Sequence, residues 1–87
     1  MHARVPVLTP ASYANLTAVL VPGLRAARLE RALSQELLAE RAGLGRRTVS
    51  RGESGLNIRV SSVRRLAAAL RVAPRRLLQA PTPSPSH

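Results

Sequence analysis

The sequence contains no cysteine, and its two histidines, His2 and His87, lie at the ends of the chain. A disulfide framework and a Cys/His zinc site are therefore excluded. Tyr13 is the only aromatic residue, which argues against the nucleic-acid binders that stack bases on aromatic side chains. No apolar run approaches the ~20 residues that a membrane span requires. Pro6 and Pro10 interrupt the first twenty residues, which lack the pattern of a signal peptide.

Acidic residues and lysine are also scarce. The 87 residues include four acidic and fourteen basic side chains, which give a net charge of +10, and every basic side chain is arginine. A surface with this charge attracts a polyanion, either nucleic acid or an anionic membrane. Arginine favours bidentate contacts to phosphates and guanines. An Arg- and Ala-rich composition without lysine is, however, equally what a GC-rich genome encodes.

The residues needed for catalysis are missing as well. The chain has no Ser/His/Asp or Cys/His set, and its four glutamates show neither paired-carboxylate nor metal-ligand spacing. We therefore interpret the protein as a non-enzyme that uses no metal and no cofactor. A small basic protein without disulfides suits the cytoplasm.

Residues 1–22 are expected to form an arm followed by an additional helix. Thr9 is a candidate N-cap and Pro10 a candidate first helical residue. Three apolar residues then fall on one helical stripe before Pro22 and Gly23 interrupt it: Tyr13, Leu16 and Leu20. The alternative is an extended segment over residues 19–21.

Residues 23–78 show the patterns of several short helices. The segment Leu24 to Leu33 is rich in strong helix formers. Ser34 is the N-cap of a helix from Gln35 to Ala42, and Gly43 ends that helix in a left-handed conformation.

A third helix is expected from Arg46 to Glu53, with Val49 inward and Arg47 and Arg51 outward. Apolar residues at three- and four-residue spacing predict a fourth helix: Val60, Val63, Leu66, Ala67 and Leu70. A short turn follows, with Pro74 at its start and Leu77 and Leu78 folding back onto the protein. Residues 79–87 are mostly Pro, Ser and Thr and are expected to form a disordered tail.

The middle of the chain carries a specific motif. Residues 33–44 read Leu-Ser-Gln-x-x-Leu-Ala-x-x-Ala-Gly-Leu, and residues 46–51 read Arg-Arg-Thr-Val-Ser-Arg. On these residues, segment 24–78 resembles a Cro/C1-type (XRE-family) helix-turn-helix domain. The resemblance implies an all-α, compact four- to five-helix lambda-repressor-like fold, here with an extra N-terminal helix and a disordered C-terminal tail.

The resemblance also assigns roles to individual residues. Base edges in the DNA major groove would be contacted by Arg46, Arg47, Thr48 and Arg51. Phosphates would be contacted by Gln35 and Ser50, and Gln35 would also brace the first residue of the recognition helix. Gly43 corresponds to the turn between the two helices.

Arg28 and Glu53 would form a structural ion pair that ties the first helix to the end of the third. Two glycines depart from the family pattern. Gly45 stands where Ser or Thr usually caps the recognition helix, and Gly52 stands where a large apolar residue usually fills the core. We therefore expect a gap under the recognition helix, and a stabilising effect of Gly52→Leu.

The function that the motif implies is a sequence-specific transcription regulator, acting as a repressor, that binds double-stranded DNA as a homodimer in the cytoplasm, associated with the nucleoid. A variant of this hypothesis is the antitoxin of a toxin–antitoxin pair, with the toxin bound by the N-terminal segment. A hypothesis from another class is a cationic peptide that binds membranes or polyanions through charge alone. That class has no use for the turn at Gly43.

Overall fold

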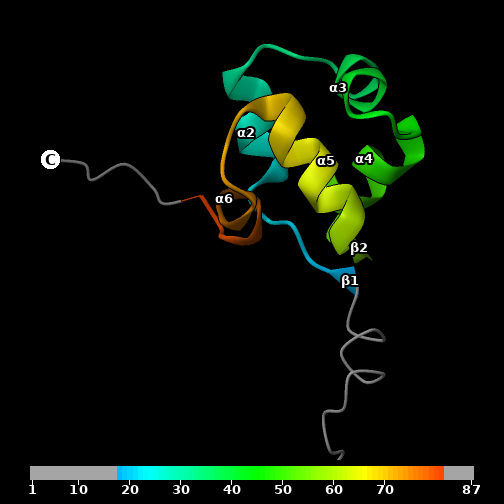
Figure 1. Cartoon of the computed structure of the whole chain (residues 1–87). Helices are drawn as coiled ribbons and strands as arrows, with labels where there is room; N and C mark the ends of the chain where they lie inside the picture. The colour runs from blue at the N-terminus through cyan, green and yellow to red at the C-terminus, as the bar shows by residue number, and fades with distance from the viewer. Residues whose placement is uncertain (1–17, 82–87) are drawn as a thin grey trace, which may run out of the picture.

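A computed structural model describes residues 18–81. These residues form five helices and two short strands (Figure 1). In chain order they are β1 (Ala18–Val19), α2 (Leu24–Glu30), α3 (Gln35–Ala42), α4 (Arg46–Glu53), β2 (Ile58–Arg59), α5 (Val60–Leu70) and α6 (Pro74–Leu78). The expected compact helical architecture is confirmed. None of the helices in this part of the chain is long and apolar enough to cross a membrane.

Local signals account for the ends of α3. The Ser34 side chain accepts a hydrogen bond from the backbone N–H of Leu37 at 3.0 Å, which satisfies one of the free donors at the start of the helix. Gly43 ends the helix with a φ of 70°, a conformation that glycine adopts without steric cost. The Leu44 N–H then donates to the Ala39 carbonyl, and the chain turns sharply toward α4.

The first helix is shorter than expected, because α2 ends at Glu30 and not at Leu33. Ala32 takes a left-handed φ of 57°. The Leu33 N–H reaches back to the Arg28 carbonyl at 3.3 Å, which closes the helix end as glycine closes many others. Leu33 is thereby turned into the core, where 8% of its surface remains exposed.

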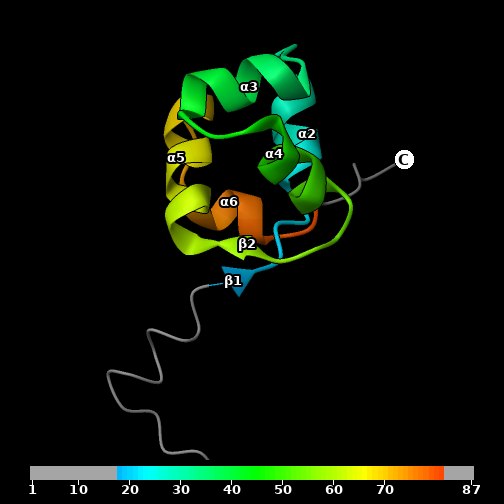
Figure 2. The same cartoon turned by 90° about the vertical axis from the view of Figure 1, so that its right-hand side faces the viewer.

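The core lies among α2, α3, α5 and α6, with α4 packed against α3 on one side (Figures 1 and 2). Each of the four helices contributes at least one fully buried leucine: Leu24, Leu38, Leu66, Leu70 and Leu77. Burying one such side chain stabilises the fold by about 1.5–3 kcal/mol. Leu78, which we expected to fold back together with Leu77, is instead 43% exposed.

The expectation of a helix extending to Leu20 is wrong at its C-terminal end. Ala18–Val19 is a strand that pairs antiparallel with β2, with Ala18 opposite Arg59 and Val19 opposite Ile58. The extended alternative is therefore correct at Val19. The earlier part of the expected helix, and residues 82–87 of the expected tail, lie outside the described residues.

The expected gap beneath Gly52 is also absent. Val21, in the segment between β1 and α2, is 2% exposed and occupies that space. A Cβ atom built on Gly52 would lie 2.8 Å from Val21 Cγ2 and 3.1 Å from Leu24 Cδ2. Val21 thus fills the part of the core that a large apolar side chain at position 52 was expected to fill.

Candidate nucleic-acid interface

Helix α4 has one buried face and one cationic face. Val49 and Gly52 are buried against the rest of the protein, whereas three arginines of the helix are exposed: Arg46, Arg47 and Arg51. Thr48 and Ser50 are partly exposed at the borders of this face. The i, i+4 spacing of Arg47 and Arg51 places them one turn apart on the same side of the helix.

No carboxylate in residues 18–81 forms an ion pair with the exposed arginines of α4. Within this range the ion pairs are Arg28 with Glu53 and Arg76 with Glu30, the latter an exposed contact of 2.6 Å. Guanidinium groups without an internal partner keep their full charge and all their donors for an external anion. The cationic face of α4 is therefore suited to an anionic ligand.

The cationic face continues onto β2 and the loop before it. A shallow hollow beside α4 is lined by Thr48 and Arg51 and, from outside the helix, by Ala18, Asn57, Ile58, Arg59 and Ser62. Asn57 and Arg59 are exposed and were not among the residues assigned from the sequence. The only sequence signal for them was their place in the polar loop after α4, because their approach to α4 depends on how that loop folds.

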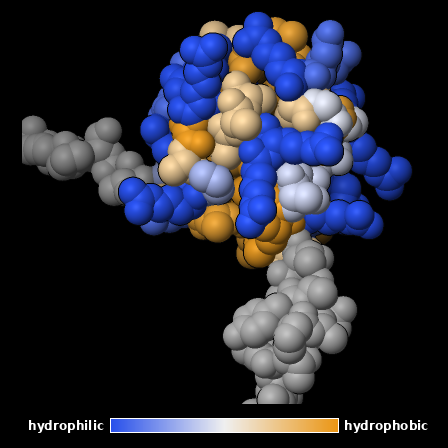
Figure 3. All heavy atoms as spheres, viewed as in Figure 1, coloured by the Kyte–Doolittle hydropathy of each residue, from blue (hydrophilic) through white to orange (hydrophobic). Residues whose placement is uncertain are grey.

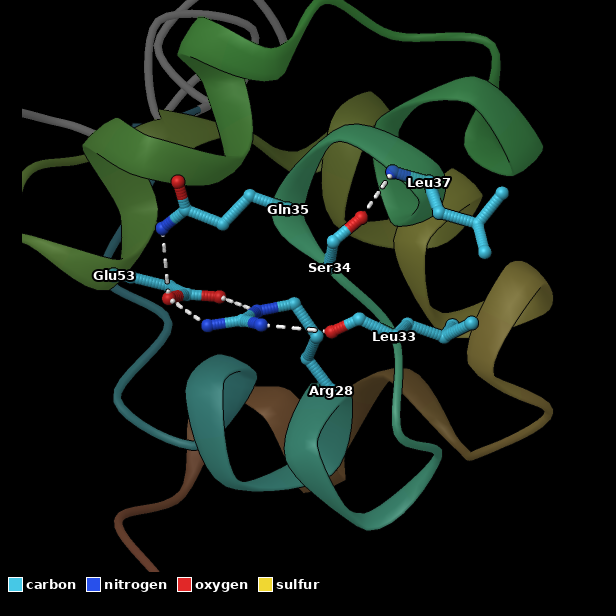
Figure 4. A network of polar contacts seen from close by, with 6 residues as sticks. All are labelled: Arg28, Leu33, Ser34, Gln35, Leu37 and Glu53. Carbon is cyan, nitrogen blue, oxygen red and sulfur yellow. Dashed lines mark hydrogen bonds and ion pairs between the residues drawn. The ribbon is translucent and has the colours of Figure 1, made fainter.

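The C-terminal end of α4 is held by a polar network that joins it to α2 and α3 (Figure 4). Arg28 donates twice to Glu53, from Nε to Oε2 at 2.5 Å and from Nη2 to Oε1 at 2.9 Å. A third donor, Nη1, bonds the Leu33 carbonyl at 2.8 Å. The two charged side chains are only 11% and 6% exposed. This bidentate arrangement fixes both distance and orientation between α2 and α4.

The ionisation of the pair follows from these contacts. The hydrogen bond to Glu53 raises the pKa of Arg28 above its usual value, against the opposing effect of burial. Burial alone would raise the pKa of Glu53, but hydrogen bonds from Arg28 and Gln35 outweigh it and hold that pKa below its usual value. Glu53 is therefore a charged structural residue at neutral pH.

Gln35 braces a different end of α4 from the one the family resemblance implied. Its Nε2 donates to Glu53 Oε1 at 3.0 Å, so it supports the last residue of the helix and not Arg46 at the first. Figure 4 shows its amide oxygen turned away from the ion pair. This contact forms because α3 packs against α4 with its first residue, Gln35, next to the last residue of α4, Glu53.

Comparison with known proteins agrees with this geometry. A helix-turn-helix family model matches residues 24–77. The crystal structure of the restriction-modification controller protein C.AhdI from Aeromonas hydrophila is 42% identical, with a TM-score of 0.59, over 62% of this chain and 83% of that one. The hypothetical transcription factor NHTF from Neisseria is also 42% identical, with a TM-score of 0.60, over 67% of this chain and 66% of that one. No match was found among the curated proteins.

Proposed function

This chain belongs to the XRE-type helix-turn-helix family of DNA-binding transcription regulators, and on that premise we propose that it reads a specific duplex sequence by placing α4 in the major groove. The observation that carries the proposal is the exposed row of arginines on a helix whose opposite face is buried and whose end is held by the Arg28–Glu53 pair. A rigidly held helix presents its side chains to base edges in one register.

The roles of the side chains follow from their positions. Arg47 and Arg51, one turn apart on the exposed face, would each bind the O6 and N7 atoms of a guanine. Arg46 and Thr48, at the start of the same helix, would contact neighbouring base edges.

Gln35 and Ser50 would bind phosphates. Gln35 uses one N–H of Nε2 for Glu53, and the second N–H of the same nitrogen would donate to a phosphate oxygen. The hydroxyl of Ser50, which is partly exposed, would make a similar contact.

The quaternary state and the regulatory sign belong to the same proposal. A homodimer would place two copies of α4 in major grooves ~34 Å apart, on a palindromic site. Binding at a promoter would repress the gene behind it. A toxin on residues 1–22 receives no support from the described part of that segment, where β1 pairs with β2 and Val21 is buried within the same chain.

Selection of duplexes from a random pool, followed by sequencing, tests the proposal. Arg47→Ala or Arg51→Ala should weaken binding to the selected site by ~1–3 kcal/mol and relax the preference at one base position. Arg75→Ala is the matched control, because Arg75 is also exposed but lies on α6. If both α4 variants select the original consensus, α4 is not the reading helix.

Salt dependence supplies an independent measurement. Each phosphate contact should contribute about 0.9 to the slope of log affinity against log salt concentration. Gln35→Ala and Ser50→Ala should lower affinity for all sequences alike while leaving the consensus intact. An affinity that does not change between low and physiological salt would contradict DNA binding altogether.

A further inference from the structure

A second cationic surface lies away from α4, between the C-terminal parts of α3 and α5. Two adjoining shallow depressions there share Arg41, Ala68 and Ala69. The deeper one is completed by Arg31 and Arg71, and the other, which is nearly flat, by Arg65. We call this surface the arginine hollow. Figure 3, which views the molecule from the α5 side, shows a pale apolar patch bordered by strongly hydrophilic side chains.

The arginines of the hollow come from separate parts of the chain. Arg31 follows α2, Arg41 lies on α3, Arg65 lies on α5, and Arg71 follows α5. Two of them are tethered to backbone carbonyls: Arg31 Nε donates to the Leu70 carbonyl at 2.8 Å, and Arg65 Nη1 makes a longer contact of 3.5 Å to the Gly43 carbonyl. The short bond of Arg31 orients its guanidinium group before any ligand binds, which lowers the entropy cost of binding at that side chain.

The four arginines carry more positive charge than is needed to stabilise the helix C-termini beside them. Three helices, α2, α3 and α5, end beside the hollow, and each C-terminus carries a partial charge of about −0.5. Four guanidinium groups therefore leave a clear positive excess. Within residues 18–81, none of the four forms an ion pair with a carboxylate.

The floor of the hollow is apolar. Ala68 is exposed and Ala69 is partly exposed, and Leu33 contributes to the lining on the side of Arg31. Residues 18–81 contain no aromatic side chain on which a nucleic-acid base could stack. A phosphate backbone would use the arginines but would leave the methyl groups facing water, whereas an amphipathic helix with carboxylates beside small apolar residues would use both.

We propose that the arginine hollow is a docking site for an acidic, amphipathic helical segment of a partner protein. Carboxylates of the partner pair with Arg31, Arg41 and Arg71, and its apolar side chains rest on the alanine floor. No residue of α4 lines the hollow, which lies beside the C-terminal half of α5, whereas the shallow hollow beside α4 reaches α5 only at Ser62. The site is therefore open while α4 occupies DNA, so the same molecule can bind both partners.

The test uses a fluorescent synthetic helical peptide of about four turns, with glutamates flanking a stripe of alanine and leucine, and a control peptide with glutamine at every glutamate position. Anisotropy titrations of the full chain should show binding of the Glu peptide, and at least about tenfold weaker binding of the Gln peptide. Arg41→Ala and Arg71→Ala should each weaken binding about two- to fivefold. Arg75→Ala, on α6, should leave it unchanged.

Ala68→Gln separates a shaped site from simple charge attraction, because it covers the floor without altering any charge. It should weaken binding at least as much as Arg41→Ala does. Equal losses for Arg75→Ala and Arg41→Ala, or unchanged binding to Ala68→Gln, would overturn the proposal. Far-UV circular dichroism and thermal unfolding of each variant ensure that a loss does not reflect misfolding.

A saturating amount of the selected duplex completes the experiment. The Glu peptide should remain bound, because α4 and the hollow are separate. Displacement of the peptide by the duplex would assign the hollow to the nucleic-acid surface and overturn the docking proposal, while leaving DNA reading by α4 intact. If Arg47→Ala and Arg51→Ala both select the original consensus, sequence reading by α4 is overturned, but the peptide-binding result is unaffected.

Discussion

Replacement of Gly52 by alanine should destabilise the protein, even though alanine is the better helix former. The new Cβ would lie 2.8 Å from Val21 Cγ2 and 3.1 Å from Leu24 Cδ2, whereas carbon atoms pack at about 3.5–4.0 Å. Val21 is stiff at χ1 and 2% exposed, so it has little room to move. Overpacking of this kind costs about 1–3 kcal/mol, against a gain in helix propensity of about 1 kcal/mol. The net loss is about 0–2 kcal/mol.

A double-mutant cycle with Val21→Ala measures the contact directly. Val21→Ala alone removes two buried methyl groups and should cost roughly 1–2 kcal/mol. In the double variant the methyl group of residue 52 enters the space that Val21 vacates. The double variant should therefore lose less unfolding free energy than the two single variants together, by about 1 kcal/mol or more. Such non-additivity indicates that the two side chains compete for the same space.

Urea unfolding of the four proteins, followed by circular dichroism at 222 nm, gives the required free energies. Leu20→Ala is the matched control, because Leu20 precedes Val21 in the chain but is 53% exposed. Its combination with Gly52→Ala should be additive within ~0.5 kcal/mol. If the Val21 cycle is equally additive, or if Gly52→Ala raises stability on its own, Val21 does not fill the space next to Gly52.

Three further predictions concern the ends of α4. Arg28→Ala should lower the free energy of unfolding by about 2–4 kcal/mol, because the buried Glu53 carboxylate loses two hydrogen-bond donors. Adding Glu53→Gln should restore part of this loss, but not the part due to the bond from Arg28 to the Leu33 carbonyl. If urea titrations of the double variant show no recovery, the pairing is contradicted. The pKa of Glu53 is lowered in the folded protein, so its stabilising contribution is complete above its unfolded pKa of about 4.5 and is lost as the pH falls through its folded pKa. The free energy of unfolding of Glu53→Gln should therefore depend less on pH below about 5 than that of the wild type. Gly45→Ser should raise the free energy of unfolding by a few tenths of a kcal/mol, and the melting temperature with it, because Gly45 has an extended N-cap conformation with open space around it and no side chain to cap the helix. A lowered melting temperature would show that the hydroxyl does not reach the free N–H groups.

Much of the candidate interface could be predicted from the sequence, because the signals involved are local. The Ser34 cap and the left-handed Gly43 define where α3 begins and ends through bonds to residues three or four positions away. The helical period likewise places Val49 inward and Arg47 and Arg51 outward before any tertiary contact is known. The pairing of Arg28 with Glu53, 25 residues apart, came only from the family resemblance.

The sequence by itself thus determined α3, the turn between α3 and α4, and the cationic face of α4, since each depends on backbone conformations and spacings within a few residues. Only the tertiary structure decided what surrounds them. The strand at Ala18–Val19 exists because Ile58–Arg59, about 40 residues away, offers it backbone partners. Val21 fills the space at Gly52 because the segment between β1 and α2 packs against α4. Likewise, three helices, α2, α3 and α5, must pack together before their arginines can surround Ala68 and Ala69. Contacts between distant segments depend on the packing of the whole core, which no local pattern encodes.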